Sequence, residues 1–206
     1  MEQHMNQITL IGNPSSRPVY SHSNHGRHFY SFTLEVNRLS GTVDRLQILA
    51  PAELLEQVEI TEHCALCVIG QIRSYNSHKP GGRHLIISVL ADSIELTDLP
   101  HDNRVTLLGN ICKQPIYRRT PLGREICDVM LAVNRSYRRA DYLPCILWGY
   151  NARDAADCTV GTPLLLTGRM QSRQYIKMLE DHSEERIAYE ISAITSQILS
   201  SEDEEA

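Results

Sequence analysis

An internal repeat constrains the fold of this 206-residue chain more than any other feature. The chain aligns with itself without a gap from Asn6 against Asn103, at an offset of 97, and the match returns as VIGQIRS over LTGRMQS and as LADSIELT over ISAITSQI. A repeat of this kind indicates one structural unit present twice. We therefore expect an N-terminal domain at 1–100, a C-terminal domain at 101–199 and an acidic tail at 200–206. The identical positions include Asn6/Asn103, Thr9/Thr106, Gly12/Gly109, Asn13/Asn110, Pro18/Pro115, Tyr20/Tyr117, Gly26/Gly123, Arg27/Arg124, Val36/Val133, Asn37/Asn134, Arg38/Arg135 and Asp44/Asp141.

Each copy has the pattern of short strands separated by turn residues. The second copy contains five expected strands, RVTLLGN, EICDVMLAVNR, DYLPCILWG, TPLLLTGRMQSRQYIKM and ERIAYEISAITSQIL, with a short helix from NARDAAD after the third. The first copy repeats this order, with PAELLEQVEI as its helix. The expected fold class is all-β: two tandem OB-fold five-stranded barrels, each with a short helix between strands 3 and 4.

The charge distribution differs between the two copies. The net charge of -5 argues against a nucleic-acid partner, because binding to phosphates usually depends on basic residues. However, residues 103–199 carry 13 basic and 10 acidic side chains, whereas residues 1–102 carry 7 and 11. The second copy is therefore the better candidate for binding an anion.

The chain has no sequence feature of export or of a membrane span. No apolar run approaches the roughly 18 residues that a span requires, and MEQHMNQITL lacks the segments of a signal peptide. Six cysteines, at 64, 67, 112, 127, 145 and 158, lie mostly in apolar runs. We expect a cytoplasmic protein with reduced, buried thiols.

Several motifs of the second copy carry a family resemblance. They are NRVTLLGN (103–110), the turn residues Pro115 and Gly123, LAVNR (131–135), ILWG (146–149) and GRMQSRQY (168–175). In this order they resemble the bacterial single-stranded DNA-binding protein family, SSB. The resemblance implies sequence-independent binding and protection of single-stranded DNA in replication, recombination or repair. It implies no catalysis and no cofactor or metal, and a cytoplasmic, nucleoid-associated location.

The resemblance also implies a set of stacking residues on the second copy. Rings on an open sheet capture unpaired bases, and each stacked base contributes about 1 to 3 kcal/mol. The family's aromatic positions correspond here to Tyr137, Tyr142, Trp148 and Tyr175, although Trp148 has packing inside the barrel or its interface as an equal alternative. Phosphate contacts are expected from nearby cations, for which solvation or pairing with acids is the alternative. These cations are Arg118, Arg119, Arg124, Arg135, Arg138, Arg139, Arg169, Arg173 and Lys177.

The first copy has lost most of these rings. Ser40, Arg45 and Pro51 stand at the places of Tyr137, Tyr142 and Trp148, and Ser77 or Asn76 stands near that of Tyr175. It keeps Tyr75 and Arg73 as candidate DNA-binding residues, with Phe29 and Tyr30 as further rings and Lys79 and Arg83 as further cations. We expect unequal copies, the first binding DNA weakly, differently, or serving as a pairing surface.

Other interpretations concern metals, catalysis and partners. HCALC (63–67) contains a CxxC pair, but no second pair at suitable spacing, which favours strand residues over a zinc site. No phosphate loop or hydrolase motif is present, so an enzyme is not expected. The alternative function is an OB-fold scaffold subunit of a replication, primosome or conjugation complex, and RNA is a further ligand that stacking would tolerate.

Assembly is also inferred from the resemblance. A homodimer would bring together four OB domains, and twofold pairing is the commonest form of assembly. The tail SSEDEEA resembles the acidic end through which the family recruits replication and repair partners, but it lacks a hydrophobic ending. A solvated acidic end is therefore an equal alternative to partner recruitment.

Overall fold

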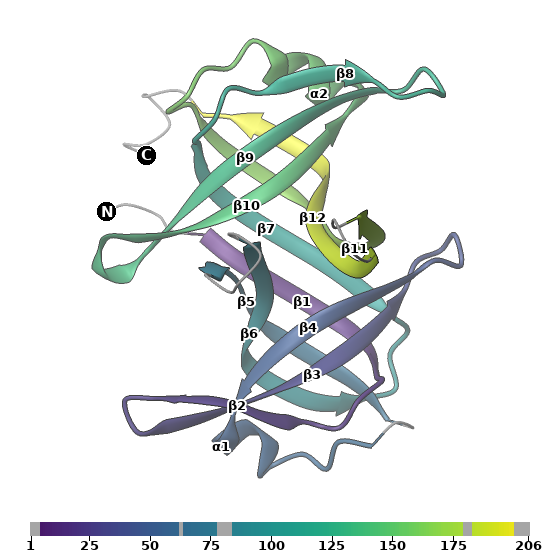
Figure 1. Cartoon of the computed structure of the whole chain (residues 1–206), viewed down its shortest axis with the longest axis vertical. Coiled ribbons are helices and arrows are strands. Elements are labelled where there is room, and N and C mark those ends of the chain that lie inside the picture. Colours follow the sequence, from purple (N-terminus) through teal and green to yellow (C-terminus); the bar gives the residue numbers. More distant parts are fainter. Residues whose placement is uncertain (1–4, 62–63, 78–83, 179–182, 200–206) are drawn as a thin grey trace.

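The computed structural model describes residues 5–61, 64–77, 84–178 and 183–199, without the side chains of Lys177 and Glu184. The expected all-β class is confirmed, since most of these residues lie in strands and few lie in helices. Figure 1 shows two similar halves, one above the other. Within the described ranges no helix is long and apolar enough to span a membrane.

The two halves repeat the same order of elements. The first half contains β1 (Met5–Pro14), β2 (Val19–Asn24), β3 (Arg27–Asn37), β4 (Val43–Pro51), α1 (Ala52–Leu55), β5 (Ala65–Ser77) and β6 (His84–Thr97). The second contains β7 (Asp102–Ile111), β8 (Ile116–Arg119), β9 (Glu125–Arg135), the 3-10 turn η1 (Ser136–Arg138), β10 (Arg139–Trp148), α2 (Gly149–Ala156), β11 (Pro163–Met178) and β12 (Ser183–Ile198).

Two details differ from the sequence analysis. Each half has a sixth strand, β2 or β8, which pairs with the start of the next strand because Gly26 and Gly123 adopt positive φ and close the turn. The closing strands are also one residue out of the expected register. Ile48 pairs with Val89 and Cys145 with Ile191, so Val89, rather than Leu90, corresponds to Ile191.

The core of each half is formed by alternate strand residues, as a half-buried sheet requires. Leu143, Cys145 and Leu147 of β10 are buried, and so are Leu46, Ile48 and Ala50 at the corresponding places of β4. All six cysteines are free thiols; Cys127, Cys145 and Cys158 are buried, whereas Cys64, Cys67 and Cys112 are partly buried. The expectation of burial thus holds for three of the six.

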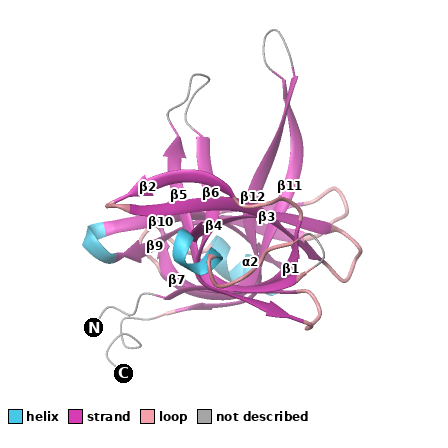
Figure 2. Ribbon diagram, turned by 90° about the horizontal axis from the view of Figure 1, so that it is seen from below, coloured by secondary structure: helices cyan, strands magenta, loops and turns pink. Residues whose placement is uncertain are grey.

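The halves are joined along one seam. β1 pairs with β7 in antiparallel register, with Ile8 opposite Val105, so one ladder runs through both halves in a twelve-stranded sheet. Because Ile8 and Val105 are matching positions of the repeat, the two halves are related by an approximate twofold axis at this pair. The long hairpins β5–β6 and β11–β12 project on one side of the molecule (Figure 2), where Arg186 donates Nη1 to Nδ1 of His84 at 2.9 Å.

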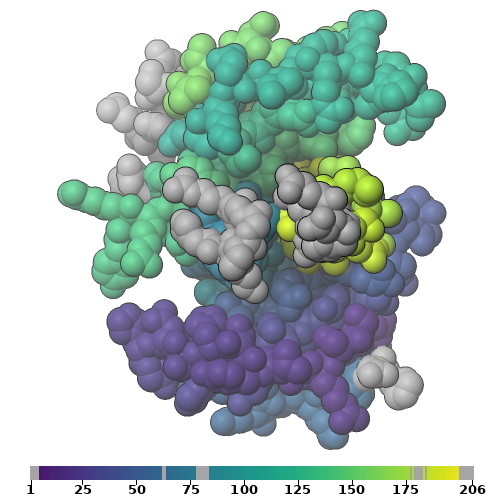
Figure 3. Space-filling view, in the orientation of Figure 1, coloured from purple at the N-terminus to yellow at the C-terminus, as the bar shows by residue number. Residues whose placement is uncertain are grey.

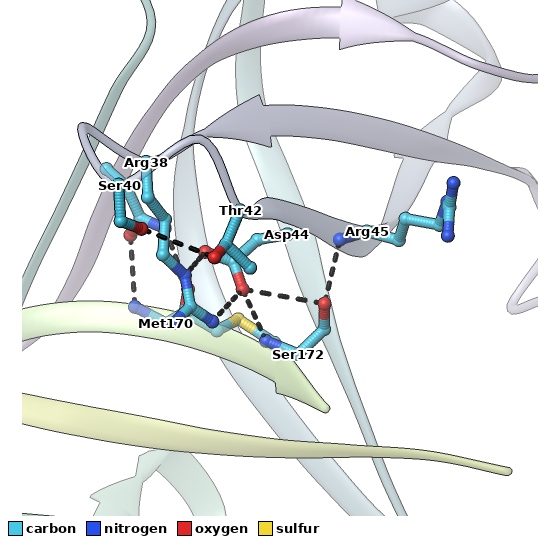
Figure 4. A network of polar contacts seen from close by, with 8 residues as sticks. Arg38, Ser40, Thr42, Asp44, Arg45, Met170 and Ser172 are labelled. Atoms are coloured by element: carbon cyan, nitrogen blue, oxygen red, sulfur yellow. Dashed lines mark hydrogen bonds and ion pairs between the residues drawn. The ribbon is translucent and has the colours of Figure 1, made fainter. Parts of the chain in front are cut away.

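Two buried aspartates cross the seam in reciprocal fashion. Asp44 accepts hydrogen bonds from Nε and Nη2 of Arg38 at 2.7 and 2.6 Å, and from the backbone N–H of Ser172 in the other half at 2.7 Å (Figure 4). In the mirrored contact, Asp141 accepts the backbone N–H of Ser74 at 2.6 Å. These contacts explain why the pairs Arg38/Arg135 and Asp44/Asp141 are identical in the two copies.

The other repeated residues also have structural roles. The amides of Asn6 and Asn103 each bond both backbone groups of a residue in the fourth long strand of their own half, Ile72 and Met170. At Gly109 a Cβ would lie 2.5 Å from the carbonyl oxygen of Ala132, and the same clash arises at Gly12. The repeat therefore preserves the residues at which neighbouring strands approach closely in each half, including the β1–β3 and β7–β9 pairings.

We predict that Asp44→Ala lowers the free energy of unfolding by about 3–5 kcal/mol, because it leaves a partly buried guanidinium without its carboxylate. Urea denaturation followed by circular dichroism measures this change. Asp128→Ala is the matched control: Asp128 pairs with Arg118 at an exposed site, where we expect less than about 1 kcal/mol. Equal losses in the two variants would contradict the role of the seam.

Candidate nucleic-acid interface

The outer face of the second half brings most of the candidate rings together. On β10 the outward residues alternate with the buried ones and include Tyr142 and Trp148. On β11 the residues out of phase with buried Leu166 and Met170 are Arg169, Arg173 and Tyr175. β12 lies between these strands and links them in one sheet. These five residues therefore share one face of the second half.

Tyr142 and Tyr175 are the exposed rings of this face, with 46% and 37% of their surfaces accessible. The guanidinium of Arg173 lies 6.0 Å from the ring centroid of Tyr175, at the limit of a cation–π contact. The backbone of Tyr142 is fixed across the seam, because its N–H donates to Oγ of Ser74 at 2.7 Å. A positioned ring and a cation beside a ring suit contact with bases and phosphates.

Tyr137 lies at the tip of the β9–β10 hairpin and is 94% exposed. Tyr137 and Arg138 both adopt left-handed backbone conformations, with φ of 63° and 55°, which non-glycine residues rarely do. Strained backbone is concentrated at functional sites. The exposed ring and the neighbouring exposed Arg138 and Arg139 thus form a candidate contact on the hairpin, at the left in Figure 1.

Trp148 is the ring for which the sequence left open contact with DNA or packing in the barrel or its interface. Its Nε1 donates to Oγ of Ser192 at 3.0 Å, and its side chain is half-buried. The indole is therefore anchored to β12 along its polar edge. Because the ring remains partly accessible on the same face as Tyr142, both anchoring and contact with a ligand are compatible with its position.

The candidate cations differ in how they are held. Arg118 forms a two-pronged ion pair with Asp128 at 2.6 and 3.1 Å, and Arg119 lies 3.4 Å from Glu125. Arg73 and Arg135 both approach buried Asp141, at 3.1 and 3.4 Å, so each has a structural role at the seam. Arg124, Arg138 and Arg139 are exposed and have no ion pair within the described part of the chain.

The remaining candidates lie partly buried, in the first half, or outside the described residues. Arg169 is half-buried, and its Nε has no hydrogen-bond partner among the described residues. Tyr75 is exposed on β5 of the first half. The side chain of Lys177 lies outside the described residues, as do Lys79, Arg83, His63 and the acidic tail. Of the HCALC motif, Cys64 donates Sγ to the Thr61 carbonyl and Cys67 lies within β5.

A groove continues this face across the seam to the first half. The cavity has a volume of about 340 Å³, and its lining includes Arg38 and Arg45 of the first half with Gln171, Arg173 and Glu190 of the second. Arg45, which replaces a ring in the first copy, is also paired with Glu35 at 2.9 Å. The contribution of Arg38 and Arg45 cannot be seen from the sequence of either copy alone, because the groove is formed by residues of both halves.

Glu190 is the acidic residue that sequence reasoning did not single out. Partial burial raises the pKa of its carboxyl, while the positive charges of Arg173, Arg38 and Arg118 oppose that shift. Its contact with this face depends on the pairing of β11 with β12, which no local pattern of the sequence contains. An acid at this place limits the positive potential of the face.

We predict that Glu190→Gln is more stable than the wild-type protein at neutral pH, since ionisation of a carboxyl with a raised folded-state pKa disfavours the folded state. The advantage should shrink as the pH falls through that raised pKa, because the wild-type carboxyl then becomes neutral. Urea midpoints measured between neutral pH and the ordinary pKa of a glutamate test this. A difference that does not vary with pH would contradict the assignment.

Comparisons with known proteins first define the class of fold. The wild-type single-stranded DNA binding protein from Thermus aquaticus superposes with a TM-score of 0.78 at 22% identity, over 96% of this chain and 94% of that one. A deletion mutant of the same protein gives the same TM-score over 97% and 96%. The chain is thus an all-β protein with the OB fold of these structures.

Sequence comparisons then give the family. The model of the "Single-strand binding protein family" matches residues 102–199. "Single-stranded DNA-binding protein B" of Bacillus subtilis (strain 168) is 39% identical over 80 residues, which cover 35% of this chain and 71% of that protein. The chain therefore belongs to the single-strand binding protein family. It spans only half of "Single-stranded DNA-binding protein 2" of Listeria innocua, at 38% identity.

Proposed function

We propose that this protein binds single-stranded DNA without reading its sequence, chiefly on the outer face of the second half. The observation that carries the proposal is the gathering of Tyr142, Trp148 and Tyr175 with Arg169 and Arg173 on one sheet face. Its family membership and the names of its relatives support the same ligand.

Binding is by stacking and charge, with no catalytic step. Unpaired bases expose flat faces that Tyr142 and Tyr175 can stack against, while Tyr137 extends the contact beyond the sheet. Every base has such a face, so stacking does not depend on sequence. Arg138, Arg139 and Arg173 neutralise phosphates along the strand. Coverage of this kind protects single strands in replication, recombination or repair, and we expect the protein with the DNA in the cytoplasm.

We further propose that each half is one OB domain, residues 1–100 and 101–199. The repeated order of strands and the helix after the fourth strand of each half support this division. The family model matches the second domain alone, which agrees with its fuller set of rings. The two domains therefore contribute unequally to binding.

A homodimer with four OB domains is our proposal for the assembly. Ile69 on β5 and Ile194 on β12 are exposed apolar side chains that pairing would cover. Light scattering on the full chain should give about twice the mass of one chain. A mass of 23.4 kDa, that of a single chain, would contradict the proposal.

We predict that oligo(dT) changes the fluorescence of Trp148, the only tryptophan of the chain, and that affinity falls steeply with salt as counterions return to the phosphates. Single strands should bind much more tightly than duplexes at equal salt. Equal affinity for both, together with an unchanged tryptophan signal, would exclude the proposed function. Oligo(U) in the same titration measures the preference for DNA over RNA.

Replacing single rings by alanine tests the proposed face. Tyr137→Ala, Tyr142→Ala and Tyr175→Ala should each weaken oligo(dT) binding by about 1 to 3 kcal/mol and leave the unfolding curve nearly unchanged. Tyr150→Ala is the matched control, because Tyr150 is also an exposed tyrosine of the second half but lies on α2. Wild-type affinity in all three test variants would remove the assignment of these rings.

A further inference from the structure

We propose that the first half has its own base-stacking site, formed by Phe29 and His22 on the β2–β3 hairpin with Arg27 beside them. The inference rests on the proposed function and concerns a half whose family ring positions carry Ser40, Arg45 and Pro51. Its ligand is a nucleobase and the adjoining phosphate of the same single strand.

Strand register places Phe29 where the second half has a tryptophan. In the second half Trp148 of β10 lies directly opposite Ile126 of β9. At the matching positions of the first half, 97 residues earlier, Pro51 of β4 lies opposite Phe29 of β3. Each pair thus contains one large ring, Trp148 on β10 in the second half and Phe29 on β3 in the first. Directly opposite residues of an antiparallel pair share a face with about 5 Å between their Cβ atoms.

Trp148 and Phe29 both lie on the outward face of the sheet. Phe29 is out of phase with buried Phe32 and Leu34 and in phase with Glu35, whose partner Arg45 lines the groove at the seam. The outer face of the first half therefore has a ring at the place corresponding to Trp148. A comparison of aligned residues alone misses it, because the aligned residue is Pro51.

The surroundings of Phe29 form a stacking platform. The imidazole of His22 lies parallel to the Phe29 ring, with centroids 5.0 Å apart and 10° between the planes. Oγ of Ser21 and Nδ1 of His22 are 3.0 Å apart, a hydrogen bond that orients the exposed imidazole. Histidine and phenylalanine are both rings on which nucleic-acid bases stack. The half-buried ring thus supports an exposed one that extends the stack outward.

Arg27 supplies the positive charge of the site. Its guanidinium carbon lies 5.8 Å from the Phe29 centroid, and its Nε is 3.2 Å from Glu53. Both side chains of this ion pair are more than half exposed, at 53% and 55%, and exposed pairs contribute little energy. Arg27 can therefore exchange Glu53 for a phosphate at small cost while it stays beside the ring.

The hairpin also lies on the path of a bound strand. The β2–β3 hairpin and the β9–β10 hairpin, which carries Tyr137, project from the same side of the molecule in Figures 1 and 2. In Figure 3 both lie on the face shown, the β9–β10 hairpin above the β2–β3 hairpin. A single strand that leaves Tyr137 can reach the second platform without passing around the protein.

Affinity measurements with two lengths of oligo(dT) separate this site from the face of the second half. We expect Phe29→Leu and His22→Ala to match the wild type on about 10 nucleotides, which one OB domain covers, and to weaken binding of about 25 nucleotides roughly 5- to 150-fold. Tyr20→Leu is the matched control, since Tyr20 packs edge-on against Tyr30 on the opposite face of the hairpin. His22 is exposed, so its variant carries the test if Phe29→Leu is destabilised.

Unchanged binding of the longer oligonucleotide by His22→Ala would overturn the inference, and so would an equal loss on both lengths. Photo-crosslinking of the full chain with 5-iodouracil oligonucleotides gives the direct readout. Crosslinked peptides containing residues 22–29 as well as residues from the second half support the site. Crosslinks confined to the second half overturn it and leave the proposed function intact, whereas a protein that does not bind the oligonucleotides at all refutes the proposed function itself.

Discussion

The pairing of β1 with β7 is the interaction on which the arrangement of the protein depends. It places Ile8 opposite Val105 and so fixes the approximate twofold axis. Once this axis is set, the β3–β4 hairpin meets β11 and the β9–β10 hairpin meets β5. The buried carboxylates of Asp44 and Asp141 complete these two contacts. Buried charges are tolerated only with such complete partners, so the register of the seam and the two aspartates specify one another.

This geometry explains the composition of the candidate interface. Asp141 holds Arg73 and Arg135 at the seam, while Arg138 and Arg139 on the same hairpin stay exposed. Basic residues close together in the chain therefore divide between those paired at the seam and those left exposed to a ligand. The division cannot be seen from net charge, which is negative for the chain as a whole.

The sequence was sufficient for the all-β class and for the position of several candidate residues in the fold, because these depend on local patterns. Alternating apolar residues located β9 and β10, and Tyr137 lies at a hairpin tip, as expected for a polar segment between two strands. The anchoring of Trp148 by Ser192 depended on a contact 44 residues away, which no local pattern contains. The position of Phe29 opposite Pro51 was also hidden, because it becomes visible only when paired strands, rather than aligned copies, are compared.

The covalent connection between the halves has a consequence for how such a protein changes over time. In an assembly of identical chains, every substitution is made at two symmetric places, so the loss of a ring is felt twice. Here one chain carries both sides of the axis, so the two matching positions can differ, as Arg45 and Tyr142 do. Joining the halves thus frees each surface to diverge, while the seam between them continues to require that matching residues stay the same.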